Sequence, residues 1–500
     1  MSKFFISTAI PYVNANPHIG FSMELIQADV IARYQRLKGD EVFFLTGTDE
    51  NALKNVQAAE RANISVGEFI DKHAQRFIDL TKVMNLSNND FIRTTEGRHV
   101  KGAQKLWQAC MDAGDIYKKN YKGLYCVGCE EFKTEKDLID GKCPEHGTKP
   151  ETVKEENYFF KLNKYEKELL RLIESEELII VPETRRNETL QFIKQGLKDF
   201  SVSRSRARAK NWGVPVPGDD DQIQYVWFDA LSCYMNALGY GEQSKQFKEW
   251  WQTGQINHLI GKGVNRFHTI YWPAMLMSAK LALPRKVFIH GYVNIDGEKM
   301  SKTIGNVVDP FRLVEKYGVD VVRYFLLREI PSTEDGDFSE KKLTERYNGD
   351  LANGLGNLVQ RILTLIENNL DNELIYKTDF IQDDIKHFVI NVKEKYKKNI
   401  DNFTLHEALG NIWELIAFAD KYLNDKKPWQ LVKEDEKEFL AVMTNLVFIV
   451  YTIWAFLLEP FMPETAKKIR DSFGAEEKIS HIENYKFVVK KGGVLFPRIQ

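Results

Sequence analysis

The first hundred residues alternate between short apolar runs and longer segments with helical spacing. Residues 4–7 and 41–45 are apolar stretches of strand length, whereas in residues 19–37 apolar side chains recur every three or four positions. Residues 50–62 again have the composition of a helix. Strand, helix, strand and helix in this order predict a parallel sheet covered by helices, an arrangement typical of nucleotide-binding α/β domains.

The composition and the predicted secondary-structure pattern of the chain change at about residue 116. From there to residue 224 the sequence is rich in Lys, Glu, Gly and Tyr, and the strand-and-helix pattern resumes at residues 225–238. We therefore expect a split Rossmann-like nucleotide-binding domain, with a first half at residues 1–115 and a second half at residues 225–345. Residues 116–224 are expected to form an inserted connective domain.

The last third of the chain has few glycines and prolines and is predicted to be an α-helical bundle, residues 346–500. Apolar residues recur every three to four positions in residues 405–416, as on the buried face of a helix. Residues 439–458 carry no charge and are long enough to cross a bilayer. Polar residues interrupt this run and two prolines close it, so we favour a buried helix over a membrane span.

Composition narrows the class of protein. The formal net charge of the 500-residue chain is −2, so a nucleic-acid partner would have to bind a local patch rather than a basic protein as a whole. No secretory leader is evident near the N-terminus. Only five cysteines are present and three of them cluster, which favours metal binding in a reducing compartment over disulfides. We expect a soluble cytoplasmic protein.

The cysteine cluster has the spacing of a zinc site. Cys126-x-x-Cys129 is followed by Cys143-x-x-His146, two chelating pairs separated by a loop. Four buried or redox-active residues are the alternative interpretation. Four protein ligands leave no open coordination position, so one structural zinc per chain is predicted.

Two further motifs have the composition of an anion-binding site. In Pro17-His18-Ile19-Gly20 a proline and a glycine flank a histidine where a strand passes into a helix, and free N–H groups at a helix start attract phosphate. Far along the chain, Lys299-Met300-Ser301-Lys302-Thr303 places two lysines in a loop bounded by glycines. Mobile ammonium groups can stabilise charge that develops on a leaving pyrophosphate. Each motif alone also fits an ordinary surface loop, and the pair is far more specific.

Together these motifs resemble the HIGH and KMSKS signatures of class I aminoacyl-tRNA synthetases, and the resemblance to methionyl-tRNA synthetases covers nearly the whole chain. The matching segments are Ala9-Ile10-Pro11-Tyr12, Thr46-Gly47-Thr48-Asp49-Glu50, Tyr225-Val226-Trp227-Phe228-Asp229-Ala230, Trp272-Pro273-Ala274-Met275 and His290-Gly291-Tyr292. The resemblance implies activation of methionine by ATP, with Mg²⁺, and its transfer to the 3′ end of tRNA(Met). It also implies the bacterial type with a zinc knuckle in the inserted domain.

The resemblance assigns roles residue by residue. Catalysis falls to His18, Gly20, Lys299 and Lys302. The methionine site comprises Ile10, Tyr12, Asp49, Arg204, Trp227, Ala230, Tyr234 and His268, with Asp49 holding the ammonium group. The ATP site comprises His18, Gly20, Gly261, His290, Gly291 and Lys302. The anticodon would be read by Asn357, Arg361 and Trp429, because stacking on an aromatic side chain and hydrogen bonds to base edges are how single-stranded bases are recognised.

Three positions depart from the family pattern. Phe21 and Asn51-Ala52 stand where the family usually has a second histidine and His-Gly, and Gly263 stands where it usually has an acidic residue. These departures motivate two alternatives, which are a paralogue that transfers an activated amino acid to a non-tRNA acceptor and an inactive tRNA-binding protein. No appended dimerisation domain follows the helical region, so a monomer is expected.

Overall fold

The structure is a computed structural model of the whole chain, and it describes residues 2–499 apart from 129–130, 134, 145–146, 300–306, 478, 480 and 491–492. It contains two compact units, Met1–His290 and Gly291–Gln500. The domain limits expected from the sequence remain predictions.

The first unit is built on a six-stranded sheet with the order β3-β2-β1-β12-β13-β7, in which all neighbours are parallel. Its strands are β1 (Lys3–Thr8), β2 (Glu41–Thr48), β3 (Asp90–Arg93), β7 (Ile179–Val181), β12 (Gln255–Gly261) and β13 (Lys286–His290). The strand expected at residues 41–45 continues to Thr48, because residues 45–48 pair with β3. The Rossmann-like fold predicted from the sequence is therefore confirmed.

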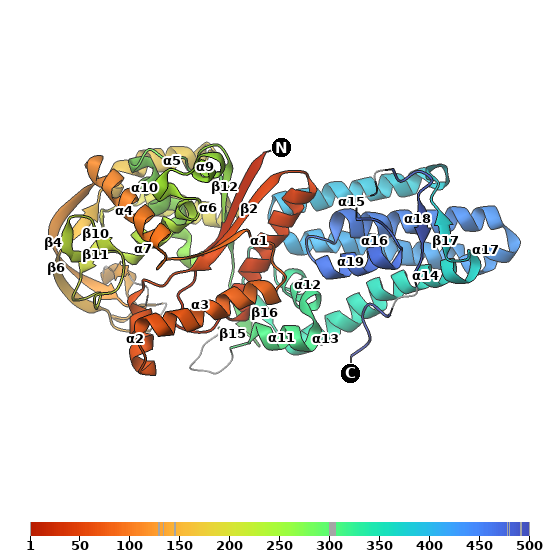
Figure 1. Cartoon of the computed structure of the whole chain (residues 1–500), viewed down its shortest axis with the longest axis horizontal. Helices are drawn as coiled ribbons and strands as arrows, with labels where there is room; N and C mark the ends of the chain where they lie inside the picture. Colours follow the sequence, from red (N-terminus) through yellow and green to blue (C-terminus); the bar gives the residue numbers. More distant parts are fainter. Residues whose placement is uncertain are drawn as a thin grey trace. The chain divides into compact units, whose positions relative to one another are not determined.

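Helices cover both faces of this sheet (Figure 1). One face packs against α1 (Ile19–Leu37), followed in the chain by α2 (Leu53–Ala62) and α3 (Val66–Val83). On the other face, Phe5, Phe43 and Leu45 share a buried core with residues of α4 (Gly97–Asp112) and α10 (Trp272–Ser278). Alternate residues of each strand thus supply two separate apolar surfaces, as the period of two requires.

The segment between residues 116 and 224 is partly a separate sheet and partly an extension of the main one. An antiparallel sheet of order β5-β4-β6-β8 contains β4 (Ile116–Cys126), β5 (Glu131–Lys133), β6 (Glu151–Phe160) and β8 (Phe200–Ser201). A second small sheet contains β9 (Ser203–Ser205), β10 (Pro215–Val216) and β11 (Asp219–Gln224). Between β6 and β8 in the sequence, α5 (Glu166–Glu174) and α6 (Glu183–Lys194) flank β7, which pairs with β13 at the edge of the main sheet.

After β11 the chain re-enters the nucleotide fold through three short helices, α7 (Val226–Leu231), α8 (Cys233–Asn236) and α9 (Lys245–Phe247). Strand β12 follows and leads into a π-helical turn, η6 (Phe267–Tyr271), which continues directly into α10. Turns of this kind widen a helix locally and are frequent at functional sites.

The second unit begins with a small sheet of order β15-β14-β16. Its strands are β14 (Val293–Ile295), β15 (Glu298–Lys299) and β16 (Gly336–Phe338). The β14–β15 hairpin turns through Asp296 and Gly297, with φ of 50° and 81°. Positive φ at both central residues is what a two-residue hairpin turn demands, and Asp-Gly suits it. The hairpin brings the chain to Lys299, where the KMSKT motif begins.

The rest of the second unit is helical, as expected. Its helices are α11 (Pro310–Tyr317), α12 (Val319–Glu329), α13 (Glu340–Arg346), α14 (Asn357–Asn369), α15 (Asp383–Asp401), α16 (Leu405–Lys426), α17 (Pro428–Glu434), α18 (Glu436–Thr452) and α19 (Pro463–Ser472). A two-stranded antiparallel sheet pairs β17 (Glu373–Ile375) with β18 (Lys486–Val488), from opposite ends of this helical region. Helix α16 packs against α12, α15 and α18, and its periodic apolar residues Leu409, Ile412 and Ile416 are buried.

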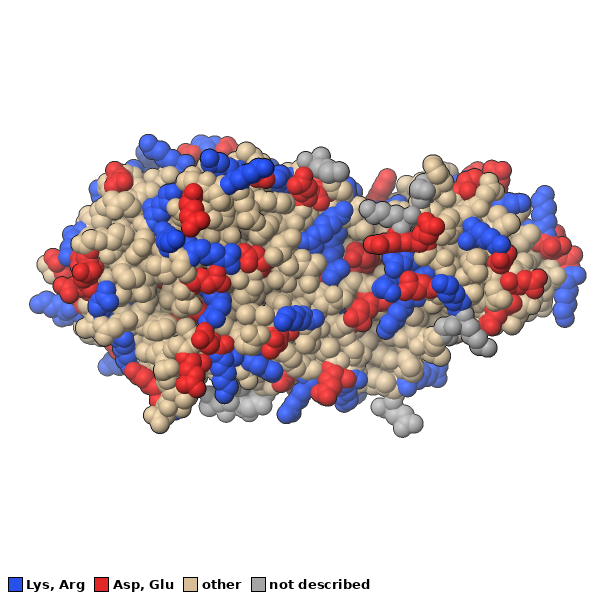
Figure 2. All heavy atoms as spheres, in the orientation of Figure 1, with Lys and Arg blue, Asp and Glu red and all other residues tan. Residues whose placement is uncertain are grey.

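The uncharged run of the sequence lies in this helical region. The segment Glu436–Leu457, comprising α18 and the turn after it, has the length and hydropathy of a membrane span, and 67% of its apolar window is buried within the protein. Asn445 on α18 accepts a hydrogen bond from the backbone N of Gln382, 3.0 Å away, and donates one to the backbone O of Phe380. These contacts fit a helix packed inside the bundle. On the face drawn in Figure 2, positive and negative side chains are intermixed, in keeping with the near-neutral net charge.

Candidate active site

Predicted site residues from four parts of the sequence meet at one edge of the main sheet. Strand order reverses between the neighbours β1 and β12, and ligands of open α/β sheets bind beyond the carboxyl ends of the strands at such a point. Ile10 and Tyr12 follow β1, Asp49 follows β2, Gly261 closes β12 and His290 closes β13. The backbones of Tyr12 and Asp49 are directly paired.

A hydrogen-bonded tyrosine–histidine pair lies on the α8 side of this edge. The Oη of Tyr234 lies 2.6 Å from Nε2 of His268, and Nδ1 of His268 lies 2.9 Å from the backbone O of Val264. Burial lowers the pKa of His268 to about 4, although the hydrogen bond to Val264 opposes the shift. The ring is therefore neutral near pH 7, with its proton on Nδ1, and Tyr234 donates to Nε2.

Aromatic rings wall the space around this pair. Trp227 stacks on Phe267, with ring centroids 3.9 Å apart and an interplanar angle of 8°. Its edge contacts are with Tyr12 at 6.3 Å and His268 at 6.4 Å. Ala230, one helical turn after Trp227 on α7, is buried and small. Large polarizable rings beside a small residue are surroundings suited to an apolar or thioether side chain.

Buried rings also pack against Tyr234, and the sequence alone did not identify them as part of the site. The ring of His258 lies 4.5 Å from that of Tyr234. Its Nε2 accepts a hydrogen bond from the indole N–H of Trp272 at 3.2 Å, so its Nδ1 donates to the Oγ of Ser7 at 2.8 Å. Burial, with a smaller contribution from His268, lowers the pKa of His258 well below its ordinary value. These rings hold Tyr234 in place with uncharged groups.

Asp49 lies in a buried polar cluster. The backbone N of Asn51 donates to Oδ1 of Asp49 at 3.1 Å, and the side-chain amide of Asn51 donates to Oδ2 of Asp229 at 3.2 Å. Burial and, second, the charge of Asp49 raise the pKa of Asp229 well above its ordinary value. Arg204, also buried, places its guanidinium 5.6 Å from the ring centroid of Tyr225. Asp229 was not predicted from the sequence as a site residue.

His18 caps the start of α1. Its Nδ1 accepts a hydrogen bond from the backbone N of Gly20 at 3.2 Å. An acceptor at Nδ1 puts the proton of the neutral ring on Nε2. The HIGH-like segment therefore combines a side-chain donor with the positive end of a 19-residue helix, the combination that binds phosphate.

The ends of β12 and β13 lie close together near α1. Nε2 of His290 is 2.8 Å from Oε2 of Glu24, and both side chains are buried. A Cβ atom on Gly261 would lie 3.4 Å from the His290 ring and 3.8 Å from Glu24. A side chain at position 261 would thus contact both groups, and glycine leaves this space unfilled. The sequence singled out Gly261 and His290 but not Glu24.

Of the predicted zinc ligands, Cys126 and Cys143 are described, and both are buried and form no disulfide. Cys129 and His146 lie outside the described residues. Within the described part of the chain no group of three or more candidate metal ligands is found. The backbone N of Gly147 donates to the backbone O of Cys143 at 2.8 Å.

The second unit contains the other predicted residues. Lys299 ends β15, and Met300 to Thr303, including Lys302, lie outside the described residues. A Cβ on Gly291 would lie 2.1 Å from the backbone O of Glu334, so close backbone packing alone accounts for this glycine.

The three predicted anticodon residues lie on α14 and α17. Asn357 is exposed one turn before Arg361, whose guanidinium lies 2.8 Å from Oδ1 of Asp420 and 2.7 Å from Oδ1 of Asn424. Trp429 is 44% exposed, and the Arg361 guanidinium lies 5.8 Å from its ring centroid. The structure thus presents an open aromatic face beside a fixed cation.

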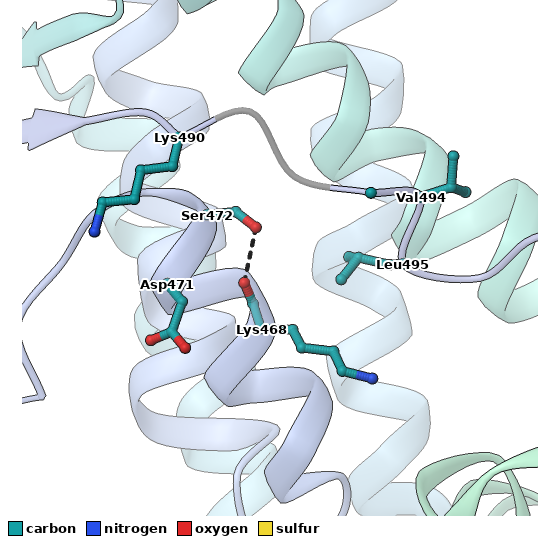
Figure 3. Close-up of a pocket in the computed structure, with 7 residues that line it drawn as sticks. Lys468, Asp471, Ser472, Lys490, Val494 and Leu495 are labelled. Atoms are coloured by element: carbon teal, nitrogen blue, oxygen red, sulfur yellow. Dashed lines mark hydrogen bonds between the residues drawn. The ribbon is translucent and has the colours of Figure 1, made fainter.

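The same unit has a surface pocket of about 390 Å³ that no sequence motif indicated (Figure 3). It lies between α19 and the C-terminal segment and is lined by Lys468, Asp471, Ser472, Lys490, Gly493, Val494 and Leu495. The Oγ of Ser472 donates to the backbone O of Lys468 at 2.8 Å. This pairing is internal to the helix and gives the pocket no distinct chemistry.

Comparison with known proteins agrees with the geometry. The family model described as class I tRNA synthetases (M) matches residues 4–149 and 134–363, and the anticodon-binding domain of methionyl tRNA ligase matches residues 381–491. The methionine–tRNA ligases of Caldanaerobacter subterraneus subsp. tengcongensis and Thermotoga maritima are each 44% identical to the chain, over 99% of it and 79% of their own length. A Mycobacterium tuberculosis methionyl-tRNA synthetase, solved in complex with methionyl-adenylate, matches with a TM-score of 0.93 and 39% identity over 100% of both chains. From the paired strand ends to the helical region, then, the chain belongs to the class I methionyl-tRNA synthetases, the ligases that join methionine to tRNA.

Proposed function

We propose that the cleft beyond β1, β2 and β12 binds methionine, and that the pair formed by Tyr234 and His268 is the observation that carries this assignment. His268 is neutral and its Nε2 accepts a hydrogen bond from Tyr234, so the pair places no charged group beside the substrate side chain. Trp227 and Tyr12 add polarizable rings, and Ile10 and Ala230 supply apolar surface. A thioether needs such a cavity, because it forms only weak hydrogen bonds.

Asp49 supplies the carboxylate for the methionine ammonium group. It is 1% exposed and lies directly after β2, beside Tyr12. Arg204 stands in the same buried cluster, where its positive charge stabilises ionised carboxylates. Charge pairing in a buried site is stronger than in water, which favours the zwitterionic amino acid over uncharged analogues.

ATP binds where α1 begins. His18 donates from Nε2 and the backbone near Gly20 supplies N–H groups to the phosphates, while Gly261, His290 and Gly291 belong to the nucleoside side of the ATP site. Lys299 and Lys302 stabilise the charge that develops as pyrophosphate leaves. Mg²⁺ accompanies ATP and neutralises its phosphates. The methionine carboxylate attacks the α-phosphorus, so methionyl-adenylate and pyrophosphate form without a covalent enzyme intermediate, and positioning and electrostatics supply the catalysis.

The second unit recognises tRNA(Met). Asn357 and Arg361 present hydrogen-bonding groups one helical turn apart, and Trp429 presents a stacking face. The 3′-terminal hydroxyl of the bound tRNA then attacks the carbonyl carbon of the adenylate, so that the methionyl group is transferred to the tRNA and AMP leaves. The anticodon residues distinguish this function from a paralogue with a non-tRNA acceptor and, together with the assembled methionine cleft, oppose an inactive tRNA-binding protein.

One zinc ion completes the connective segment, bound by Cys126, Cys129, Cys143 and His146. The donor set is the chemistry that zinc prefers, and the two described thiols are buried without a disulfide. Zinc would crosslink the loop after β4 and has no step in the reaction. A cytoplasmic monomer without a membrane anchor fits the buried position of α18.

Two substitutions test the separate roles proposed for Trp227 in methionine binding and for Lys302 in catalysis. Trp227→Ala should raise KM for methionine and leave KM for ATP unchanged, because it removes only the cavity wall. Lys302→Ala should slow adenylate formation by at least about 10²-fold and leave methionine binding unchanged, the scale expected for losing one preorganised charge donor. Lys341→Ala, an exposed lysine paired with Glu345 at 3.9 Å, is the matched control and should change neither. Equal effects of Lys302→Ala and Lys341→Ala would refute the catalytic role of the loop.

A further inference from the structure

Asn51 connects two buried carboxyl groups that come from distant parts of the chain. Its backbone N–H binds Asp49 at 3.1 Å and its side-chain amide binds Asp229 at 3.2 Å. The same amide also donates to the backbone O of Thr94 at 3.2 Å, which fixes its orientation. Asp49 is 1% exposed and Asp229 is fully buried. Asn51 is one of the positions noted in the sequence as a departure from the usual family pattern.

Asp229 is incompletely satisfied in the unliganded protein. Its Oδ1 is buried and has no hydrogen-bond partner among the described residues. An ionised carboxylate in such a position needs a cation or further donors, and without them it takes up a proton. The ionisable and charged groups facing it are Asp49 beyond β2, Arg204 on β9 and Cys233 on α8. A single arginine faces two carboxyl groups.

We propose that Asp229 is a second carboxyl group of the ammonium-binding site, held beside Asp49 by Asn51, and that it ionises when methionine binds. The proposal rests on the proposed role of Asp49. In the free enzyme Asp229 is protonated, and methionine enters with its amino group already charged as –NH₃⁺. The O–H bond of Asp229 then breaks and its proton passes to solvent water, so that the ammonium group lies between two carboxylates. No bond to the methionine nitrogen forms or breaks.

This arrangement makes methionine binding depend on pH. Burial and Asp49 raise the pKa of Asp229 in the free enzyme, and the bound ammonium lowers it. At a pH between the pKa of Asp229 in the complex and its pKa in the free enzyme, methionine binding releases the proton of Asp229. The affinity for methionine therefore rises with pH in this range, by up to about tenfold per pH unit. His268 and His258 do not contribute near neutral pH, because burial lowers the pKa of His268 to about 4 and that of His258 well below its ordinary value.

Titration calorimetry of methionine binding between pH 6 and 7.5, in two buffers of different ionisation enthalpy, measures the released protons. The wild-type full-length enzyme should release close to one proton per methionine wherever its affinity is pH-dependent. Asp229→Asn should release none and should lose the pH slope, with an affinity at pH 7.5 lower by about 10- to 100-fold. Cys233→Ala, at the start of the next helix, α8, should behave like wild type.

The outcomes separate this proposal from the assignment of the cleft. Wild-type proton release by Asp229→Asn would overturn the role of Asp229, even if Asp49→Asn abolishes methionine binding. Wild-type binding by Asp49→Asn would instead refute the proposed ammonium site. If Asp229→Asn does not fold, Asn51→Ala gives a second test. The hydrogen bond from Asn51 favours the ionised form of Asp229, so its loss should shift the pH dependence of methionine binding to higher pH. An unchanged pH profile would contradict the proposal.

Discussion

Replacing Trp429 by alanine separates recognition of tRNA from activation of the amino acid. Trp429 is 44% exposed on α17 and contacts the Arg361 guanidinium at 5.8 Å from its ring centroid. Lys427, with φ of 46°, and Pro428 turn the chain sharply between α16 and α17 and fix where the indole stands. The substitution removes the stacking face and leaves Arg361 bound to Asp420 and Asn424.

The expected magnitude follows from these contacts. A base stacked on an aromatic side chain contributes about 1–3 kcal/mol, so tRNA charging efficiency should fall roughly 5- to 150-fold. The fold should lose little, because an exposed cation–π contact contributes only about 0.5–1 kcal/mol. Activation of methionine without tRNA should remain normal, since Trp429 belongs to the second unit and the methionine cleft to the first.

Pyrophosphate exchange, tRNA charging and a melting curve measured on the same preparation test this prediction. Phe456→Ala is a matched control in the same unit, because Phe456 is also 44% exposed and lies 4.6 Å from a lysine ammonium group, that of Lys393. It should leave both reactions unchanged. Equal losses of exchange and charging in Trp429→Ala, or equal charging losses in the two variants, would refute the anticodon role.

Two further predictions concern the cleft and the metal. Because burial lowers the pKa of His268 to about 4, the unfolded chain binds the proton more tightly, and the free energy of unfolding should fall as pH drops from about 6.5 towards 4. Between pH 7 and 5 the fall should be about 2 kcal/mol smaller in His268→Gln than in wild type, measured by urea unfolding, and parallel profiles would contradict the neutral buried ring. Metal analysis should find one zinc per chain, and Cys143→Ser should lose it; less than about half an equivalent in the wild type would rule out the zinc site.

Much of the first unit could be predicted because local patterns determine it. Apolar runs and helical spacing marked β1, α1 and β2, and the parallel order of such strands places their carboxyl ends on one edge. That geometry explains why Tyr12, Asp49 and Gly261, remote in sequence, could be expected at one site. The buried periodic face of α16 was likewise predicted from spacing alone.

Other features depend on contacts that no local pattern encodes. Strand β7 is three residues long and joins the main sheet from within the segment expected to be inserted, which only its pairing with β13 reveals. The rings of His258 and Trp272 pack against Tyr234, and a buried hydrogen bond joins the two rings to each other. No local sequence pattern indicates these contacts. The bridge from Asn51 to Asp229 spans 178 positions of sequence. Asn51 was noticed in the sequence as a departure from the family, and the structure supplies its contacts.

The central claim is that this chain activates methionine and transfers it to tRNA. Pyrophosphate exchange measured with each standard amino acid, followed by charging of tRNA(Met) with the activated one, tests it most directly. The account predicts exchange with methionine well above that with any other amino acid, and appearance of methionine at the 3′ end of the tRNA. Exchange that does not depend on methionine, or methionine activation without transfer to any tRNA, would contradict it.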